Sequence, residues 1–175
     1  YLTGNPQITF FKVVYRRHTN FSMESIEQVF TGNVSFGKKT SCTIARNGDL
    51  LGKMYLEMDI TGTGLVARPG HACIDYVEIE IGGQAIDKQY GEWMDIWAQL
   101  SHSSEQFEKL DRLVGGDLDA KAGGKKLYVP LQFWFNRNPG LALPLIALQY
   151  HEVKVKLTLG ATGTGSEDAK LWADY

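Results

Sequence analysis

A glycine-rich stretch comes closest to a known catalytic motif. Residues 32–40 read GNVSFGKKT, one position away from a phosphate-binding P-loop, in which a serine or threonine must directly follow the first lysine to reach Mg²⁺. Lys39 occupies that position here. A P-loop also needs a helix immediately after it, so that backbone amides converge on the phosphate, whereas residues 40–46 have the pattern of a strand. The stretch is therefore predicted to be a basic turn.

Three potential metal ligands alternate at His71, Cys73 and Asp75. In a strand this spacing would turn all three side chains to one side, as a transition-metal site requires. A fourth ligand has no obvious source in the sequence. We therefore interpret His71 as a loop histidine beside a small buried thiol, and we expect no metal and no cofactor.

The remaining histidines could serve as general bases. His18 and the His151-Glu152 pair have suitable side chains, but no serine or cysteine nucleophile motif such as G-x-S-x-G accompanies them. We interpret them as structural histidines, and we predict no catalytic residue in the chain.

A basic cluster, Arg16-Arg17-His18, follows an apolar segment that contains Phe10, Phe11 and Tyr15. Phosphate contacts with base stacking are one interpretation. A stacking platform keeps its rings exposed among polar neighbours, however, while these rings lie in a run suited to a core. The formal net charge of −2 gives no overall attraction for a polyanion. We favour a salt-bridged subunit contact, without direct nucleic-acid binding.

Two cysteines and two glycosylation sequons carry less information. Cys42 and Cys73 form no C-x-x-C pair and are predicted to be buried free thiols of a reducing compartment. The sequons at Asn20 and Asn33 have meaning only in a chain that enters the secretory route, and no signal peptide is visible, so we interpret them as chance matches.

The elements that carry these residues belong to one compact domain. The chain has 175 residues, of which 43% are hydrophobic and 22% charged, which is typical of a globular protein with one core and excludes general disorder. No apolar run approaches the ~20 residues that a membrane span needs.

Strict alternation of apolar and polar residues predicts strands at 54–60, 77–81 and 153–159. The turn dipeptides Asn47-Gly48 and Gly82-Gly83 predict two hairpins. In these, 40–46 pairs with 53–60, and 76–81 pairs with 84–88.

Three segments are less regular. Residues 8–15 read as one strand with apolar side chains on both faces, which needs a covering neighbour on its second side. Residues 127–135 are equally apolar and contain Pro130, which favours an edge position or a bulge. Residues 21–30 fit either a helical stripe or a strand before a turn, and the pattern alone leaves both open.

Helical periodicity is clearest in the middle of the chain. Trp93, Ile96, Trp97 and Leu100 form an apolar stripe over 92–100. Ser103 with Gln106 predicts a capping box for a second helix at 104–114, which ends at Gly115-Gly116. Eight or nine short strands with a helical insertion at about 91–114 predict an all-β antiparallel sandwich, and the jelly roll is its common eight-stranded form.

Four stretches resemble a known family. The chain is similar to the major capsid proteins of large icosahedral double-stranded DNA viruses, the phycodnavirus, mimivirus and iridovirus group, in residues 1–21 (YLTGNPQITFFKVVYRRHTNF), 45–50 (ARNGDL), 77–88 (VEIEIGGQAIDK) and 139–153 (PGLALPLIALQYHEV). The resemblance spans nearly the whole chain and is weakest at 61–72, 101–126 and 160–169. It implies that 21–30 is extended.

The resemblance also implies a function in a virus shell. It makes residues 1–175 a single jelly-roll domain, the first of two in a full-length chain, so the sequence is interpreted as a partial chain. It implies homotrimeric capsomers of pseudo-hexagonal shape, contacts with neighbouring capsomers and minor capsid proteins, no membrane insertion, and assembly in the cytoplasm of the infected cell. Uncovered apolar residues, including Leu141 and Leu143, agree with a subunit that covers its surface with copies of itself.

Two other classes of protein are compatible with an antiparallel β-sandwich. A carbohydrate-binding β-sandwich module would present solvent-facing aromatic residues on a sheet, for which Trp134 and Tyr55 are candidates. A cupin-like enzyme would need clustered histidine and carboxylate ligands, which the four scattered histidines do not supply.

Overall fold

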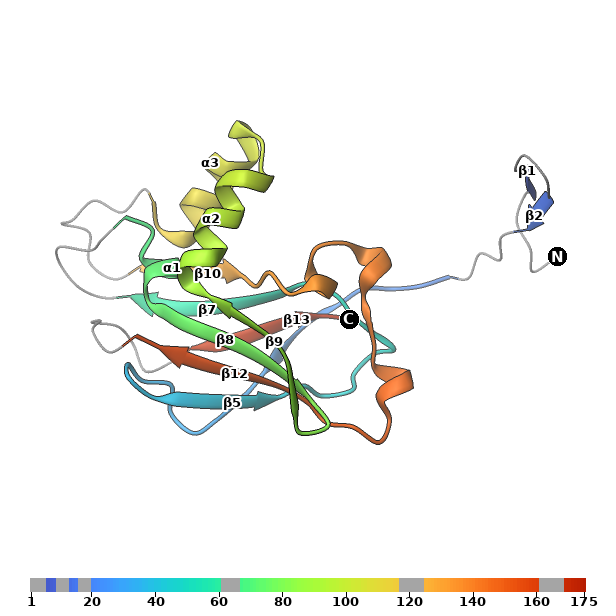
Figure 1. The fold of residues 1–175 in the computed structure, drawn as a ribbon, viewed down its shortest axis with the longest axis horizontal. Helices are drawn as coiled ribbons and strands as arrows, with labels where there is room; N and C mark the ends of the chain where they lie inside the picture. The colour runs from blue at the N-terminus through green and yellow to red at the C-terminus, as the bar shows by residue number, and fades with distance from the viewer. Residues whose placement is uncertain (1–5, 9–12, 16–19, 61–66, 117–124, 161–168) are drawn as a thin grey trace.

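The computed structural model describes residues 6–8, 13–15, 20–60, 67–116, 125–160 and 169–175. Two antiparallel sheets lie face to face in these residues, and a pair of helices stands beside them (Figure 1). The prediction of an all-β antiparallel sandwich with a helical insertion is confirmed.

One sheet has four strands and the other has five. The four-stranded sheet has the order β10-β7-β13-β3, and the five-stranded sheet has the order β4-β5-β12-β8-β9. Every pair of neighbours is antiparallel. The strands are β3 (Ser25–Gln28), β4 (Phe30–Thr31), β5 (Lys39–Thr43), β7 (Met54–Ile60), β8 (Ile74–Ile81), β9 (Gln84–Tyr90), β10 (Lys125–Pro130), β12 (Val153–Leu159) and β13 (Lys170–Asp174).

The connections make this sandwich a jelly roll. The main strands follow the chain order β3, β5, β7, β8, β9, β10, β12 and β13, and the chain crosses from one sheet to the other at every step except the β8–β9 hairpin. The first and last of these strands are neighbours in one sheet, and the second and the seventh are neighbours in the other. This nested, Greek-key type of order defines the jelly roll.

The core lies between the two sheets and is built by the predicted alternation. Every second residue of β7 and of β12 points inward, including Met54, Leu56, Val153 and Val155, which are almost fully buried. Phe133, from the segment after β10, stacks on Phe135 with ring centroids 5.8 Å apart. The strands at 54–60, 77–81 and 153–159 are confirmed.

One predicted hairpin is confirmed and the other is wrong. Gly82 and Gly83 have φ angles of 59° and 86° and close the β8–β9 hairpin as a two-residue turn. Asn47-Gly48 does not turn the chain back, because β5 and β7 belong to different sheets. Burial of Ile44 at one end of this connection and Leu51 at the other carries the chain across the core from one sheet to the other.

A short two-stranded sheet accompanies this crossing. β6 (Leu50–Leu51) pairs with β11 (Leu143–Pro144), which buries Leu143. The prediction that Leu143 depends on a neighbouring subunit for cover is therefore wrong. Leu141, which was predicted together with it, is 53% exposed.

Two of the less regular segments, 8–15 and 21–30, have different outcomes. The single strand predicted at 8–15 is wrong, because β1 (Pro6–Ile8) pairs with β2 (Val13–Tyr15) in a separate hairpin. Figure 1 shows this hairpin beyond the end of the sandwich. The segment 21–30 contains β3 and β4 and is extended, as the family resemblance implied.

The strand predicted at 127–135 is only half right. β10 lies at the edge of its sheet and ends at Pro130, and an edge position tolerates the missing amide proton of proline. The Leu131 N–H still donates to the Met54 carbonyl oxygen at 2.9 Å. Beyond it the chain forms three short 3₁₀ turns, η1 (Trp134–Asn136), η2 (Pro139–Leu141) and η3 (Leu145–Leu148).

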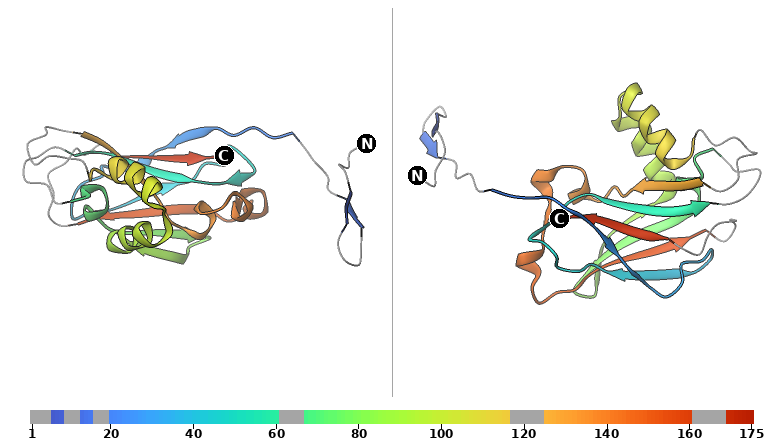
Figure 2. Two further views of the ribbon diagram at one scale, coloured as in Figure 1. Left: turned by 90° about the horizontal axis from the view of Figure 1, so that it is seen from above. Right: turned by 180° about the vertical axis from the view of Figure 1, so that it is seen from behind.

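The helices lie outside the sandwich (Figure 2). They are α1 (Pro69–Ala72), α2 (Gly91–Ser101) and α3 (Ser104–Val114). The predicted capping box of Ser103 with Gln106 is present, and Gly115 ends α3 with a φ of 91°. In the described part of the chain, no helix is long and apolar enough to span a membrane.

The buried face of α2 is not the predicted one. Met94 and Ala98 are buried, whereas Ile96 and Leu100, from the predicted stripe, are exposed. Gly91 explains this orientation, since an added Cβ would lie 2.2 Å from the carbonyl oxygen of His71. Such close approach fixes the face that contains residues 91, 94 and 98 against the body of the protein.

Candidate assembly surfaces

The glycine-rich stretch 32–40 is a turn between β4 and β5. Gly32 and Gly37 have positive φ angles of 88° and 74°, and strand β5 starts at Lys39 without an intervening helix. The Lys39 ammonium lies 3.9 Å from a Glu78 carboxylate oxygen and 5.5 Å from the centre of the Tyr76 ring. The prediction of a basic turn is confirmed.

The three alternating ligand types do not meet. His71 lies in α1, Cys73 follows that helix, and Asp75 is exposed on β8. Among the described residues, no group of three or more histidine, cysteine, aspartate or glutamate side chains is placed to hold a metal ion. The metal interpretation assumed that residues 71–75 form one strand. Because His71 lies in a helical turn instead, alternation in the sequence does not bring the three side chains together.

His71 instead belongs to a charged cluster around Arg68. The Arg68 guanidinium contacts Asp95 of α2 and Asp111 of α3, and it lies 4.8 Å above the Phe107 ring. His71 Nδ1 lies 3.4 Å from Asp95 Oδ1. The cluster joins the start of α1 to both long helices, and it was missed because its members are far apart in the sequence.

Burial and hydrogen bonds oppose one another in this cluster. Burial lowers the pKa of His71, although the hydrogen bond with Asp95 opposes that effect. Burial raises the pKa of Asp95, but the hydrogen bonds from Arg68 and His71 outweigh it and bring the pKa below its usual value. At neutral pH the cluster therefore holds a neutral imidazole beside a charged carboxylate.

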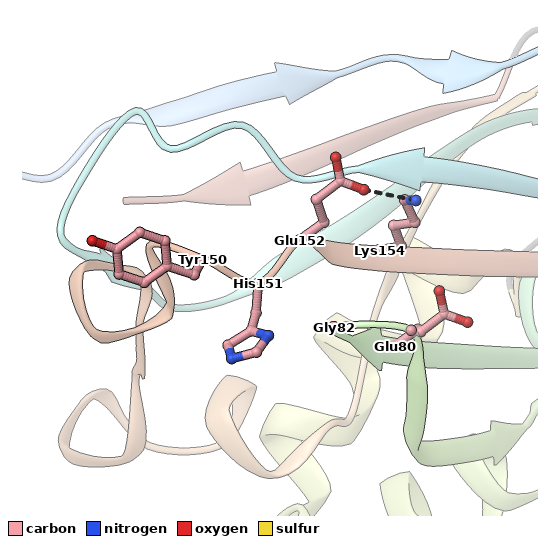
Figure 3. A pocket seen from close by; sticks show the side chains of 7 residues that line it. Glu80, Gly82, Tyr150, His151, Glu152 and Lys154 are labelled. Atoms are coloured by element: carbon pink, nitrogen blue, oxygen red, sulfur yellow. Dashed lines mark ion pairs between the residues drawn. The ribbon is translucent and has the colours of Figure 1, made fainter.

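His151 and Glu152 line a depression of about 360 Å³ at the β8–β9 turn (Figure 3). Glu152 accepts an ion-pair hydrogen bond from Lys154 at 2.8 Å, which lowers the pKa of the Glu152 carboxyl. His151 and Tyr150 are exposed. No serine, threonine or cysteine lines the depression, so the described residues there do not form a nucleophile–base pair.

Several of the other sequence candidates lie outside the described residues. His18, Arg16 and Arg17 lie outside the described residues, and so do Phe10 and Phe11. Asn20 and Asn33 are exposed. The prediction of a buried thiol is confirmed for Cys42, whose pKa burial raises to about 11, whereas Cys73 is only half-buried.

The aromatic candidates for glycan binding do not form an exposed platform. Trp134 lies in η1 and packs edge-to-face on Phe135 with centroids 5.0 Å apart. Tyr55 is half-buried on β7, and burial raises the pKa of its hydroxyl. On the same sheet the indole Nε1 of Trp172 donates to Glu57 at 2.7 Å, which further packs this face.

Exposed apolar side chains are the clearest surface feature. One group, called here the helical patch, lies on α2 and α3 and contains Trp93, Ile96, Leu100 and Leu113, which are 40–76% exposed. The helical periodicity of α2 was the signal for this group. Individually exposed apolar residues are ordinary, but a cluster marks an interaction surface.

A groove of about 480 Å³ adjoins the helical patch between α2, α3 and the β10 edge; we call it the helix–strand groove. Its apolar lining includes Met54, Leu110 and Leu131. Arg137 stands at its rim with the guanidinium 4.2 Å from the centre of the Trp97 ring. The whole lining is Lys53, Met54, Tyr55, Trp97, Ser101, His102, Gln106, Lys109, Leu110, Leu113, Pro130, Leu131, Gln132, Asn136 and Arg137.

A second apolar region lies where the chain enters the sandwich. Residues 20–24, called here the N-terminal arm, expose Phe21 and Met23 by 84% and 67%. The root of the arm is fixed, because Glu24 exchanges two backbone hydrogen bonds with Tyr175, at 3.0 and 2.9 Å. Figure 2 shows the arm continuing away from β3 beyond the sandwich.

Comparison with known proteins shows what the chain resembles. A family model described as the major capsid protein N-terminus matches residues 9–171. The major capsid protein of Pyramimonas orientalis virus is 51% identical over 193 residues, covering 100% of this chain and 49% of that protein. The chain thus spans about half the length of this relative.

Solved structures give the same result. A chain of the PBCV-1 virus capsid superposes with a TM-score of 0.82 at 41% identity, covering 95% of this chain and 45% of that one. The Faustovirus major capsid protein superposes with a TM-score of 0.71 at 11% identity, covering 96% and 56%, which shows a shared fold.

Proposed function

Because the chain belongs to the family of viral major capsid proteins and matches their N-terminal part, we propose that it is a building unit of an icosahedral virus shell. The family match over residues 9–171 carries this proposal. The jelly roll supplies a rigid block, and the exposed apolar groups supply contact surfaces. We assign it a structural role in the virion without catalysis, metal or cofactor.

In the full-length protein this jelly roll is the first of two. Coverage of 49% of the Pyramimonas orientalis virus protein and 45% of the PBCV-1 capsid chain supports a second part of similar size. Three such chains would form a trimer whose six jelly rolls give a pseudo-hexagonal outline. Closed cyclic symmetry suits a block that must tile a shell without open ends.

The partners of the block follow from this role. It contacts copies of itself within a capsomer, then neighbouring capsomers and minor capsid proteins. Direct nucleic-acid binding and membrane insertion are not part of the proposal, and assembly takes place in the cytoplasm of the infected cell. The net charge of −2 supports a partner other than a polyanion.

Light scattering on the purified full-length protein tests this function. We expect a discrete particle with the mass of three chains at micromolar concentration. Residues 1–175 alone should aggregate or form irregular oligomers, because burial of apolar surface contributes about 25 cal/mol per Å² and favours association of the uncovered patches. A monodisperse monomer of the full-length protein would contradict the proposal.

A further inference from the structure

We propose that the N-terminal arm of one copy of this chain docks in the helix–strand groove of a second copy. This inference rests on the proposed shell function and deepens it, since it names the two surfaces through which neighbouring copies meet.

The arm presents apolar side chains that its own sandwich does not cover. Phe21 and Met23 are separated by one residue, so an extended segment turns both to the same side. Both are more than two-thirds exposed, although the root of the arm is held by Tyr175. An anchored segment with two large apolar groups on one side is suited to insertion into a groove of another molecule.

The groove offers a complementary lining. Leu113, which is 42% exposed, and the half-buried Trp97 and Pro130 provide its accessible apolar surface. Met54, Leu110 and Leu131 form the buried floor beneath them. Among the described residues of the lining none is aspartate or glutamate, while Lys53, Lys109 and Arg137 are cationic. Lys109 already contacts Glu105 at 2.8 Å, which leaves Lys53 and Arg137 as the main sources of positive charge.

The charges of the arm complement those of the groove. Glu24 is exposed at the base of the arm, next to Met23. Its carboxylate can meet the Lys53 ammonium or the Arg137 guanidinium once the apolar residues are seated. Such rim contacts mainly fix register and orientation, while buried apolar groups provide the affinity.

Within one copy the arm and the groove belong to different strands of the four-stranded sheet. The arm leads into β3 at one edge of the four-stranded sheet, and the groove lies at β10, the opposite edge. Three strand spacings, about 14 Å in all, separate β3 from β10. A contact between two different surfaces of identical subunits is heterologous, and such contacts close into rings when the rotation permits.

Disulfide trapping on the full-length protein tests the contact. We would combine Met23→Cys with Leu113→Cys and oxidise the purified oligomer. We expect disulfide-linked dimers and trimers on a non-reducing gel, because a bond forms only where the two Cα atoms come within about 7 Å of each other. Each single variant, and the pair of Met23→Cys with Ile86→Cys on β9, should stay monomeric on the gel.

Charge reversal provides an independent test. Glu24→Lys or Lys53→Glu alone should weaken oligomer formation by about tenfold, and the double variant should restore most of it. Phe21→Ser should weaken it further, whereas Ile86→Ser, also at an exposed apolar residue, should leave it unchanged. Dissociation measured by dilution and light scattering gives these ratios.

The outcomes separate this inference from the proposed function. An intact trimer without trapped disulfides and without charge rescue would overturn the arm–groove contact and leave the shell function standing. A disulfide from Met23→Cys to another part of the same chain would also overturn it, since the arm would then be covered internally. A full-length protein that forms no oligomer under reducing conditions would overturn both.

Discussion

Arg68 and Asp95 are joined by a two-point contact, in which Nη1 of Arg68 lies 2.9 Å from Oδ1 and 3.1 Å from Oδ2 of Asp95. Arg68 also donates from Nε to Asp111 at 2.7 Å. One side chain thereby connects the segment before α1 to both long helices. Arg68 adopts a left-handed conformation with φ 52°, which an L-residue with a side chain accepts only at a cost.

The first prediction separates the guanidinium contacts of Arg68 from its backbone strain. Arg68→Ala should lower the free energy of unfolding by about 2 kcal/mol, because it removes charge-assisted hydrogen bonds that are only partly exposed to water. Arg68→Gly loses the same contacts but tolerates the left-handed conformation, so it should be about 1 kcal/mol less destabilised than Arg68→Ala. Urea unfolding of both variants measures the difference, and equal losses would contradict the strain argument.

The second prediction concerns acid sensitivity through His71. Burial lowers its pKa in the folded state below the ordinary value of 6.5, so the unfolded chain binds the proton more readily. The stability of the wild type should therefore fall as the pH decreases below about 6.5, until the folded-state pKa is passed. Arg68, Asp95 and Asp111 are the charged groups of the cluster and are retained in both proteins that we would compare.

The matched variant is His71→Gln, which can still donate a hydrogen bond to Asp95. Its stability should change less between pH 7 and pH 5 than that of the wild type. Thermal unfolding at several pH values gives both curves, and parallel curves would show that His71 does not contribute. Protonation of Asp95 belongs to a separate range below its ordinary pKa of 3.8.

The third prediction uses two glycines with different surroundings. An added Cβ at Gly91 would lie 2.2 Å from the carbonyl oxygen of His71 and 2.3 Å from that of Ile74, so Gly91→Ala must displace α2. We expect a loss of about 3 kcal/mol or failure to fold. At Gly52 the nearest atom is the Asp174 carbonyl oxygen at 3.5 Å, so Gly52→Ala should change stability by at most about 0.5 kcal/mol. The yields of folded protein and the unfolding midpoints of the two variants measure this difference.

The fourth prediction tests the observed orientation of α2. Met94 is 0% exposed and Leu100 is 76% exposed. Met94→Ala should cost about 2–5 kcal/mol of stability, because it empties part of the core. Leu100→Ala should change stability by less than about 0.5 kcal/mol. The opposite order in urea unfolding would restore the helix face that periodicity predicted.

Local patterns in the sequence were sufficient for much of the fold. The alternation in 54–60 and 153–159, the Gly82-Gly83 turn and the Ser103 capping box each depend on neighbours within a few residues. Such signals act through backbone sterics and short-range hydrogen bonds, so they remain visible without a structure. The family resemblance added the extended conformation of 21–30 and the assignment to capsid proteins.

Tertiary structure decided which surfaces face outward and which residues meet. Asn47-Gly48 has the composition of a hairpin turn, but burial of Ile44 and Leu51 in the core carries the chain to the other sheet. In α2, the contact of Gly91 with carbonyl groups of the preceding segment overrides the stronger apolar stripe and leaves Ile96 and Leu100 at the surface. Periodicity indicates only that a helix has an apolar face and a polar face, whereas contacts between distant residues determine which face is buried.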